Sequence, residues 1–454
     1  MSCRASLLRL IGPLLLAVPM AALEFLAACG SSSSPSGPPA TVNDAALADV
    51  AADVAAPLET STVGDAGSPE ASSTGDAATD ASTTASDAGM GCARTPAAAD
   101  RARFLVASHP FAVDGGTATT FEVLSLSETG TLARPATPVT FSMGPASNAP
   151  VLFTSDGQVG LVAQDDGTIG VFRLDASGAP SVVNAGYRGA FYASQLTLSA
   201  DGSHVYALDP DTASNHGGVY ELAIACDGTL SGERLVIPGG TAYVMALLPS
   251  DPTRALLSAG AAFNAPASAD TELVDLASPS LLASTQAFSG DAGASIPSSV
   301  AIAPDGKFAL IADDSVAAGN QMAVVALSAS NLTPVGVLST PYPTAVVISP
   351  FDNAALVLND DSTDQIHVLT YDPSSPTAPF VITGQLAYRF PPPQIPVTAS
   401  LISRGMLEGT VFVGENTAVR QVTFTASGQV NDTAQLVFPG SAFDTIVGVV
   451  GVQP

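Results

Sequence analysis

Short apolar runs alternate with polar positions along most of the chain, from about residue 100 to residue 454. Gly, Pro, Asn or Asp interrupts each run. Alternation with a period of two residues, broken by such turn formers, is typical of β-strands, and no stretch has the 3.6-residue period of an amphipathic helix. The pattern therefore predicts an all-β fold for residues 100–454.

One unit recurs within this part of the chain. A first strand ends in a tight turn, an apolar second strand follows, a loop rich in Asp and Asn leads to a third strand, and a weaker fourth strand closes the unit. The turns contain Asp156, Asp201, Asp251, Asp305 and Asp352, about 50 residues apart, and their aspartates are interpreted as turn formers. Further copies begin near residues 103 and 404. Seven copies of a four-stranded unit indicate a seven-bladed β-propeller.

The first copy lacks a strand ahead of Arg103, because residues 95–102 have the Ala-rich composition of a linker. The chain also ends in an apolar strand, residues 445–450, that belongs to no other copy. A propeller has no exposed strand edges only when its first and last blades share a sheet. We therefore expect residues 445–450 to complete the first blade and close the ring.

The turn and strands of residues 304–313, repeated at 199–220 and 350–371, resemble the YVTN/lactonase-like (6-phosphogluconolactonase-like) group of seven-bladed propellers. The absence of Trp argues against a WD40 protein. The resemblance implies the fold. Lactone hydrolases of that group carry closely spaced histidines in an Asn-Pro-His-Pro-His-like run, whereas this chain has one His-Pro pair, His109-Pro110. The resemblance therefore does not extend to hydrolase activity, and the catalytic residues, if there are any, stay unknown.

The N-terminus has the features of a secretory signal: Arg4 and Arg9 precede an apolar run that ends in Leu-Ala-Ala-Cys at Cys29. This ending resembles the bacterial lipobox, which implies cleavage after residue 28 and a lipid on Cys29. The alternative is an ordinary cleaved signal with an incidental cysteine. Gly30 favours sorting to the outer membrane over retention at the inner one. The expected location is the bacterial cell envelope, with the membrane as a partner through the lipid anchor.

Residues 29–99 consist mainly of Ala, Ser, Thr, Gly, Asp and Pro, and carry nine acidic residues before the first basic one, Arg94. Such a segment buries too little apolar surface to offset the entropy of ordering it. The predicted organisation is a signal peptide over 1–28, a disordered acidic tether over 29–99, and the propeller over 100–454.

The charge of the chain limits its partners. Forty-one Asp and Glu residues outnumber 14 Lys and Arg residues, for a net charge of −27, which argues against binding to nucleic acid. The cysteines form no Cys-x-x-Cys pair, which argues against a thiolate zinc site. Cys92 and Cys226 are candidates for a disulfide outside the cytoplasm; the alternative is two free thiols.

The loops that connect one blade to the next should open at one mouth of the central channel, where aromatic and charged side chains form a candidate ligand rim. These residues are Tyr187, Arg188, Tyr192, Tyr243, Tyr342, Tyr388, Arg389 and Phe390. The alternative is that the loops are simply polar and the tyrosines cap the channel. A weaker candidate is a Ca²⁺ site, the only cofactor expected, in an oxygen-rich run formed by Asn359, Asp360, Asp361 and Asp364.

These observations predict an exported, lipid-anchored, monomeric propeller that binds an unknown small molecule or an envelope protein. Two alternatives stay open. One is a lactone hydrolase with a divergent active site, and the other is a propeller that acts as a scaffold in an envelope assembly.

Overall fold

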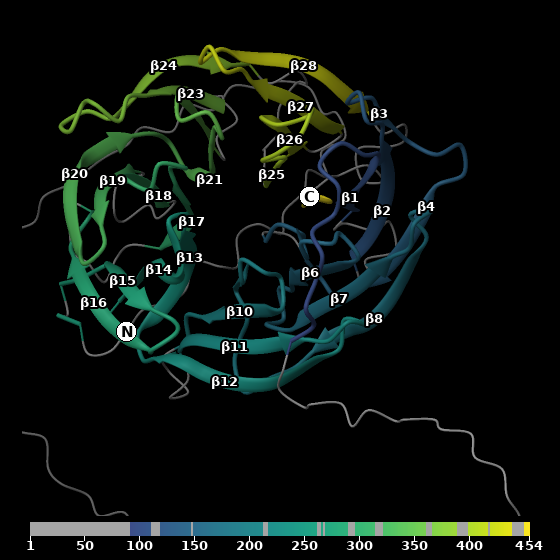
Figure 1. Ribbon diagram of the computed structural model, residues 1–454, viewed down its shortest axis with the longest axis horizontal. Coiled ribbons are helices and arrows are strands. Elements are labelled where there is room, and N and C mark those ends of the chain that lie inside the picture. Colours follow the sequence, from purple (N-terminus) through teal and green to yellow (C-terminus); the bar gives the residue numbers. More distant parts are fainter. Residues whose placement is uncertain are drawn as a thin grey trace, which may run out of the picture. The chain divides into compact units, whose positions relative to one another are not determined.

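The computed structural model describes residues 91–109, 119–146, 149–211, 217–260, 265–266, 268–288, 296–313, 321–359, 366–387, 398–415, 418–437 and 449–454. The secondary-structure elements in these ranges are all β-strands, arranged in seven antiparallel sheets around a central axis (Figure 1). This part of the chain contains no helix with the length and hydrophobicity that a membrane span requires. The predicted seven-bladed β-propeller is confirmed.

Each sheet is one blade, and its strands follow in chain order from the axis outward. Blade 1 differs, because its innermost strand comes from the other end of the chain and its edge is extended: β29 (Val450–Val452), β1 (Arg103–His109), β2 (Thr119–Leu126), β3 (Leu132–Ala133) and β4 (Val139–Met143), which also pairs with β2. Blade 2 contains β5 (Leu152–Phe153), β6 (Val159–Ala163), β7 (Ile169–Leu174) and β8 (Pro180–Tyr187). Blade 3 contains β9 (Gln195–Leu198), β10 (His204–Asp209), β11 (Gly218–Ile224) and β12 (Leu230–Pro238).

The remaining blades follow the same plan. Blade 4 contains β13 (Thr241–Leu248), β14 (Asp251–Gly260), β15 (Thr271–Asp275) and β16 (Ser280–Thr285). Blade 5 contains β17 (Pro297–Ile302), β18 (Phe308–Asp313), β19 (Gln321–Ser328) and β20 (Asn331–Ser339). Blade 6 contains β21 (Pro343–Ile348), β22 (Ala354–Asn359), β23 (Ile366–Tyr371) and β24 (Phe380–Leu386). Blade 7 contains β25 (Ala399–Leu401), β26 (Thr410–Glu415), β27 (Ala418–Phe424) and β28 (Val430–Val437).

The core lies between neighbouring blades. Second strands such as β18 and β22 are buried at every position, because another blade covers each of their faces. Their sequences are accordingly continuous apolar runs rather than alternating ones. Leu310 of blade 5, for example, packs in one cluster with Val357 of blade 6. Fourth strands such as β24 alternate between buried and exposed positions, since one of their faces meets water.

The ring closes through β29, which pairs with β1 in the register Leu105↔Val452 and Ala107↔Val450. Closure by a C-terminal strand was predicted, but its position differs. The ladder forms at Val450–Val452, whereas residues 445–448 of the predicted strand lie outside the described residues. Because both stretches are β-branched and apolar, the pattern indicates a strand without setting its register.

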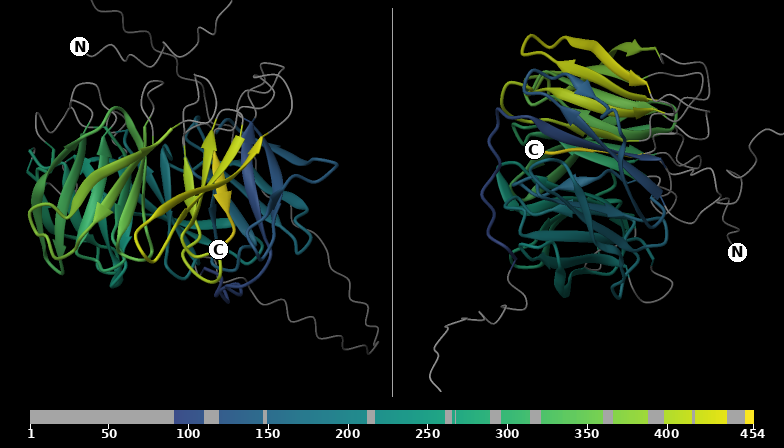
Figure 2. Two further views of the ribbon diagram at one scale, coloured as in Figure 1. Left: turned by 90° about the horizontal axis from the view of Figure 1, so that it is seen from above. Right: turned by 90° about the vertical axis from the view of Figure 1, so that its right-hand side faces the viewer.

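The blades define two faces of the ring. We call upper the face that carries the loops from second to third strands and the connections between blades, and lower the face that carries the turns from first to second and from third to fourth strands. In Figure 2 (left) the chain end near β29 lies toward the lower face. Upper loops and lower turns therefore belong to different surfaces.

Residues 91–102, which we call the strap, run along the lower face before β1 begins. Cys92 forms a disulfide with Cys226 in the turn after β11, with a Cα–Cα distance of 5.0 Å. Farther along, the Ala97 amide donates to Ser155 of blade 2, at 2.9 Å, and Arg404 of blade 7 donates to the Ala97 carbonyl, at 3.0 Å. The strap therefore contacts three blades, and the described part of the chain begins within the segment predicted to be a tether.

Candidate functional site

A cavity of about 310 Å³ lies on the propeller axis, where the first strands of blades 2 to 7 meet. Its volume falls at the lower end of the range typical of small-molecule sites. Its lining is a mixture of apolar and hydroxyl- or amide-bearing side chains, among them Leu152, Gln195, Thr197, Met245, Ser298, Ser299, Val300, Thr344, Val346 and Thr398. The channel is thus a preformed pocket with polar groups on several sides.

Hydrogen bonds inside the channel determine what it offers a ligand. Gln195 of blade 3 donates its amide to the Ser298 carbonyl of blade 5, at 2.8 Å, and so reaches past blade 4. The hydroxyl groups of Thr197 and Ser298 donate to the carbonyls of Met245 and Pro343, at 3.0 and 2.6 Å. These donor groups are therefore used, whereas the two hydroxyl oxygens and the Gln195 side-chain oxygen keep the capacity to accept hydrogen bonds. A ligand rich in O–H groups complements such a lining.

Tyr192, one of the predicted rim residues, lies directly before β9 on the upper face and is 42% exposed. Its amide donates to the buried Asp209, at 3.1 Å, and its hydroxyl donates to the Asp165 carbonyl of blade 2, at 2.5 Å. The ring covers Gly167, where an added Cβ would lie 2.3 Å from it. Tyr192 is thus fixed across two blades with one side open to solvent.

Tyr342 occupies the corresponding position before β21 and is 36% exposed. Its φ angle of 41° is a conformation that bulky residues rarely adopt. Such strained residues are concentrated at binding and switch sites. Tyr243, in contrast, packs against the core cluster that contains Phe288 between blades 4 and 5. Tyr342 therefore belongs to the exposed part of the upper face, and Tyr243 to the packing of the ring.

Tyr187 and Arg188 lie toward the outside of the ring. The Tyr187 hydroxyl, at the end of the outermost strand of blade 2, donates to Glu233 on the outermost strand of blade 3, at 3.5 Å. Burial and the Glu233 charge raise the pKa of Tyr187. Arg188 pairs with Asp166 at 3.4 Å, with both side chains exposed. Tyr187 ends β8 and contacts the outermost strand of blade 3. Arg188 and Tyr192 instead contact adjacent residues of one upper loop, Asp166 and Asp165.

The other predicted site residues are only partly described. Tyr388, Arg389 and Phe390 lie outside the described residues, and so do Asp360, Asp361 and Asp364 of the candidate calcium site. Asn359 is fully buried and accepts a hydrogen bond from Thr340, at 2.8 Å. Among the described residues, no group of three His, Cys, Asp or Glu side chains is placed to hold a metal ion.

Buried polar side chains at the upper ends of the second strands hold the connections between blades. Asp209 and Asp313 accept backbone amide protons from Tyr192 and Ile296, at 3.1 Å each. In blade 7, the buried Arg420 donates to Glu415, at 3.1 Å, and to Asp432. Burial lowers the pKa of Arg420, but these two carboxylates outweigh that effect and raise it. These groups are structural, because their hydrogen bonds fix backbone and side chains within the blades.

Comparisons with known proteins support the fold. The structure of a putative 6-phosphogluconolactonase from Bacteroides fragilis aligns with 79% of this chain, and the alignment includes 99% of that protein, at 12% identity and a TM-score of 0.52. The structure of a periplasmic gluconolactonase from Pseudomonas aeruginosa aligns with 78% of this chain, and the alignment includes 99% of that protein, at 14% identity and a TM-score of 0.54. A protein from Lactobacillus plantarum is similar over 77% of this chain, at 15% identity and a TM-score of 0.55.

No protein-family model matches the chain, and a search of curated proteins finds no match. At such low identities the structural neighbours establish the architecture alone. The chain has the seven-bladed propeller fold of the lactonase-like group, as its repeats predict.

Proposed function

We propose that this protein is an exported, lipid-anchored propeller that binds a small, hydroxyl-rich molecule in its central channel. The observation that carries the proposal is the axial cavity, whose polar groups retain acceptor capacity after their internal hydrogen bonds are made. Tyr192 and Tyr342 supply exposed aromatic surface on the upper face, and aromatic rings combined with a few polar groups are typical of small-molecule sites.

Binding in the channel is tested by a thermal-shift screen of the purified protein against sugars, polyols and lactones. Gln195→Leu removes the side chain that reaches across the channel and should abolish stabilisation by any ligand found. Gln429→Leu, at an exposed turn of blade 7, is the matched control and should retain it. Equal shifts in both variants would place the ligand outside the channel.

The upper face is tested separately. Tyr192→Ala should weaken binding of the same ligand. Tyr192→Phe keeps the ring and removes only the hydrogen bond to Asp165, so it should weaken binding less. If the alanine variant binds as well as the wild type, the ligand does not contact this residue.

The lipid anchor is a proposal from the sequence, with the outer membrane as the favoured location. Cys29 lies outside the described residues. Cys29→Ser should shift the protein from the detergent phase to the aqueous phase in a Triton X-114 partition, because several acyl chains on one residue are needed for stable anchoring. A variant that still partitions with detergent would show that another feature holds the protein at the membrane.

Lactone hydrolysis is the second candidate, and the likeness to a periplasmic gluconolactonase favours it. The described histidines contact blade residues: His109 pairs with Glu122, His204 with Ser203, and His367 with Thr340. The fourth histidine, His216, lies outside the described residues. Acid release from a panel of lactones, measured with a pH-stat, decides between the two proposals. If the wild type hydrolyses a lactone and Gln195→Leu does not, the channel is a hydrolytic site and not only a binding site.

A further inference from the structure

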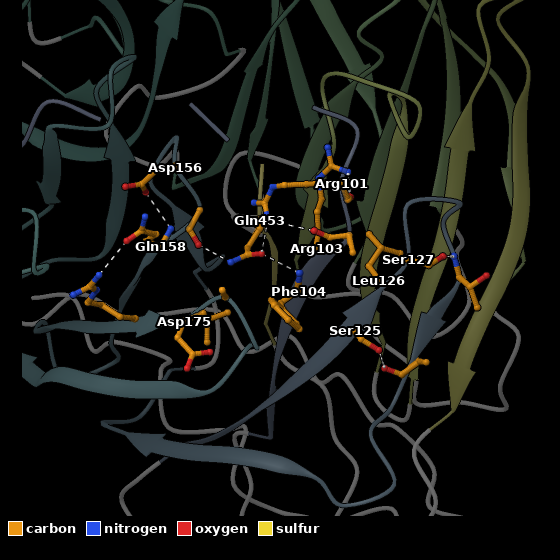
Figure 3. Close-up of a pocket in the computed structure, with 17 residues that line it drawn as sticks. Arg101, Arg103, Phe104, Ser125, Leu126, Ser127, Asp156, Gln158, Asp175 and Gln453 are labelled. Carbon is orange, nitrogen blue, oxygen red and sulfur yellow. Dashed lines mark hydrogen bonds between the residues drawn. The ribbon is translucent and has the colours of Figure 1, made fainter. Parts of the chain in front are cut away.

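A second cavity, of about 870 Å³, opens on the lower face between blades 1 and 2, away from the channel. It is bounded by the end of the strap, the start of β1, the turn after β2 and two turns of blade 2 (Figure 3). Gln453, after β29, lies near its centre and donates to the Gly157 carbonyl across the cavity. Three arginines line it: Arg101, Arg103 and Arg173.

These three arginines differ from most other basic residues of the described chain, which pair with carboxylates: Arg94, Arg134, Arg188, Arg234, Arg254, Lys307 and Arg420. Within the described residues, Arg101, Arg103, Arg173 and the nearby Arg404 form no ion pair with an Asp or Glu side chain. Arg101 also donates to the backbone oxygen of Pro454, at 3.3 Å. In a protein whose acids outnumber its bases by 41 to 14, arginines without a carboxylate partner are unexpected. Their concentration on one part of the lower face indicates a local positive potential.

The hydrogen bonds of these arginines are incomplete. Arg103 is 1% exposed and donates to the carbonyls of Arg101 and Ala99, and its Nε has no partner. Arg101 donates to the Gln453 side-chain oxygen, at 3.4 Å, while Arg173 donates to Gln158, at 3.0 Å. The Nε atoms of Arg101 and Arg173 also lack partners. Arg103 is buried, whereas Arg101 and Arg173 are half-buried. Among the described residues, no Asp or Glu side chain hydrogen-bonds to any of the three, and burial of a charge without such a partner is costly at Arg103.

The positive charges act on one another. Burial lowers the pKa of Arg101, and so does the charge of Arg404, while Asp156 acts in the opposite direction. Burial also lowers the pKa of Arg103, together with the charges of Arg101 and Arg404, while Asp100 acts in the opposite direction. An anion placed among these groups would relieve their repulsion.

The two acids at the cavity are already engaged. Asp156 pairs with Arg94 at 2.8 Å and accepts from Thr154 and from the Gln158 amide. Asp175 accepts from the backbone amides of Ser177 and Ala179 inside its own turn. Neither carboxylate pairs with an arginine that lines the cavity.

We propose that this lower cavity binds a small organic dianion, either a phosphate monoester or a dicarboxylate. Arginine forks match the oxygens of both groups in a bidentate manner. Phe104, Leu126 and Leu174 supply apolar lining for the organic part of the ligand. This site is independent of the channel, so it stands whether or not the channel binds a ligand.

The proposal is tested by titrating the purified full chain with glycerol 2-phosphate, succinate and inorganic phosphate, each compared with chloride at equal ionic strength. At least one organic dianion should raise the melting temperature when chloride does not. The comparison of glycerol 2-phosphate with succinate distinguishes recognition of a phosphate from recognition of a carboxylate. Neutral glycerol should have no effect. If no organic dianion stabilises the wild type beyond chloride, the proposal is wrong.

Variants locate the site. Arg101→Gln and Arg173→Gln should each lower the affinity for the dianion by roughly tenfold or more, which is the scale expected for loss of a hydrogen bond to a charged group. Arg234→Gln, on the outermost strand of blade 3 with an exposed side chain, removes the same charge elsewhere and should bind as the wild type does. Gln195→Leu should also leave dianion binding unchanged. Equal affinity in Arg101→Gln, Arg173→Gln and the wild type would overturn the assignment, and so would an equal loss in Arg234→Gln.

Discussion

Gly451 is the position at which closure of the ring is most sensitive to a small change. It lies in β29 opposite Val106, and its φ angle lies outside the left-handed region, so its backbone conformation is open to alanine. An added Cβ would lie 2.3 Å from the Val151 carbonyl oxygen and 2.5 Å from the Val151 Cβ of the next blade. Gly451→Ala is therefore a steric perturbation that forces β29 away from its neighbour.

The cost follows from the geometry. The obstructing atoms include backbone, which does not swing aside as a flexible side chain does, so overpacking should cost about 1–3 kcal/mol. A folded part of about 360 residues has an unfolding entropy near 0.75 kcal/mol/K, at about 2.1 cal/mol/K per residue. The melting temperature should accordingly fall by about 1–4 °C.

Gly336→Ala is the matched control, because no atom lies within 4 Å of the Cβ it would add on the outermost strand of blade 5. Its melting temperature should stay the same or rise slightly, since alanine restricts the unfolded chain. Calorimetry of the two variants at one scan rate gives the comparison. If Gly451→Ala has the same melting temperature as Gly336→Ala and the wild type, β29 does not pack against blade 2 as described, and the closure argument fails.

Two further predictions concern the strap and blade 1. Replacing Cys92 and Cys226 together with serine opens a covalent loop with a sequence separation of 134, so the chain-entropy model predicts a loss of up to about 5 kcal/mol; a melting temperature equal to that of the oxidised wild type would refute this. Burial raises the pKa of Glu122, but hydrogen bonds from His109 and Arg134 outweigh it and hold the pKa below its ordinary value. Its charge therefore stabilises the fold above the ordinary pKa of a glutamate, and this stabilisation is lost as the pH falls through the lowered pKa. Urea unfolding between pH 3 and 7 should show a smaller decline in Glu122→Gln, and an unchanged pH dependence would contradict this.

Much of the ring follows from sequence because its strands are continuous apolar runs between turn formers. The run 304–313, for example, contains the predicted turn at Asp305 and a second strand that the structure places at β18. The closing strand was predicted, but its described ladder extends past Val450 to Val452. Residues 445–452 are apolar on both sides of Val450, so composition does not determine which of them pair with β1. Register depends on contacts with two other blades, which no local pattern contains.

The sites were less predictable than the fold. Tyr187 and Tyr192 flank one short connection, yet that connection runs from the outer edge of one blade to the inner edge of the next. The arginines of the lower cavity escaped notice because the strap that carries Arg101 has the composition of a linker, and Arg173 is far away in the sequence. One signal was available: Arg94, Arg101 and Arg103 follow directly after a long stretch without a basic residue.

The disulfide of the strap also has a mechanical consequence. Because Cys92 is covalently joined to Cys226, tension applied anywhere N-terminal to Cys92 passes straight into blade 3. Residues 93–225, which include the strands of blade 1 other than β29 and all of blade 2, lie inside the closed loop and carry none of that force along their backbone. The pairing of β1 with β29 is then shielded from a pull on the N-terminal segment. In the reduced protein the same pull would act along the strap toward β1, where only non-covalent contacts oppose it.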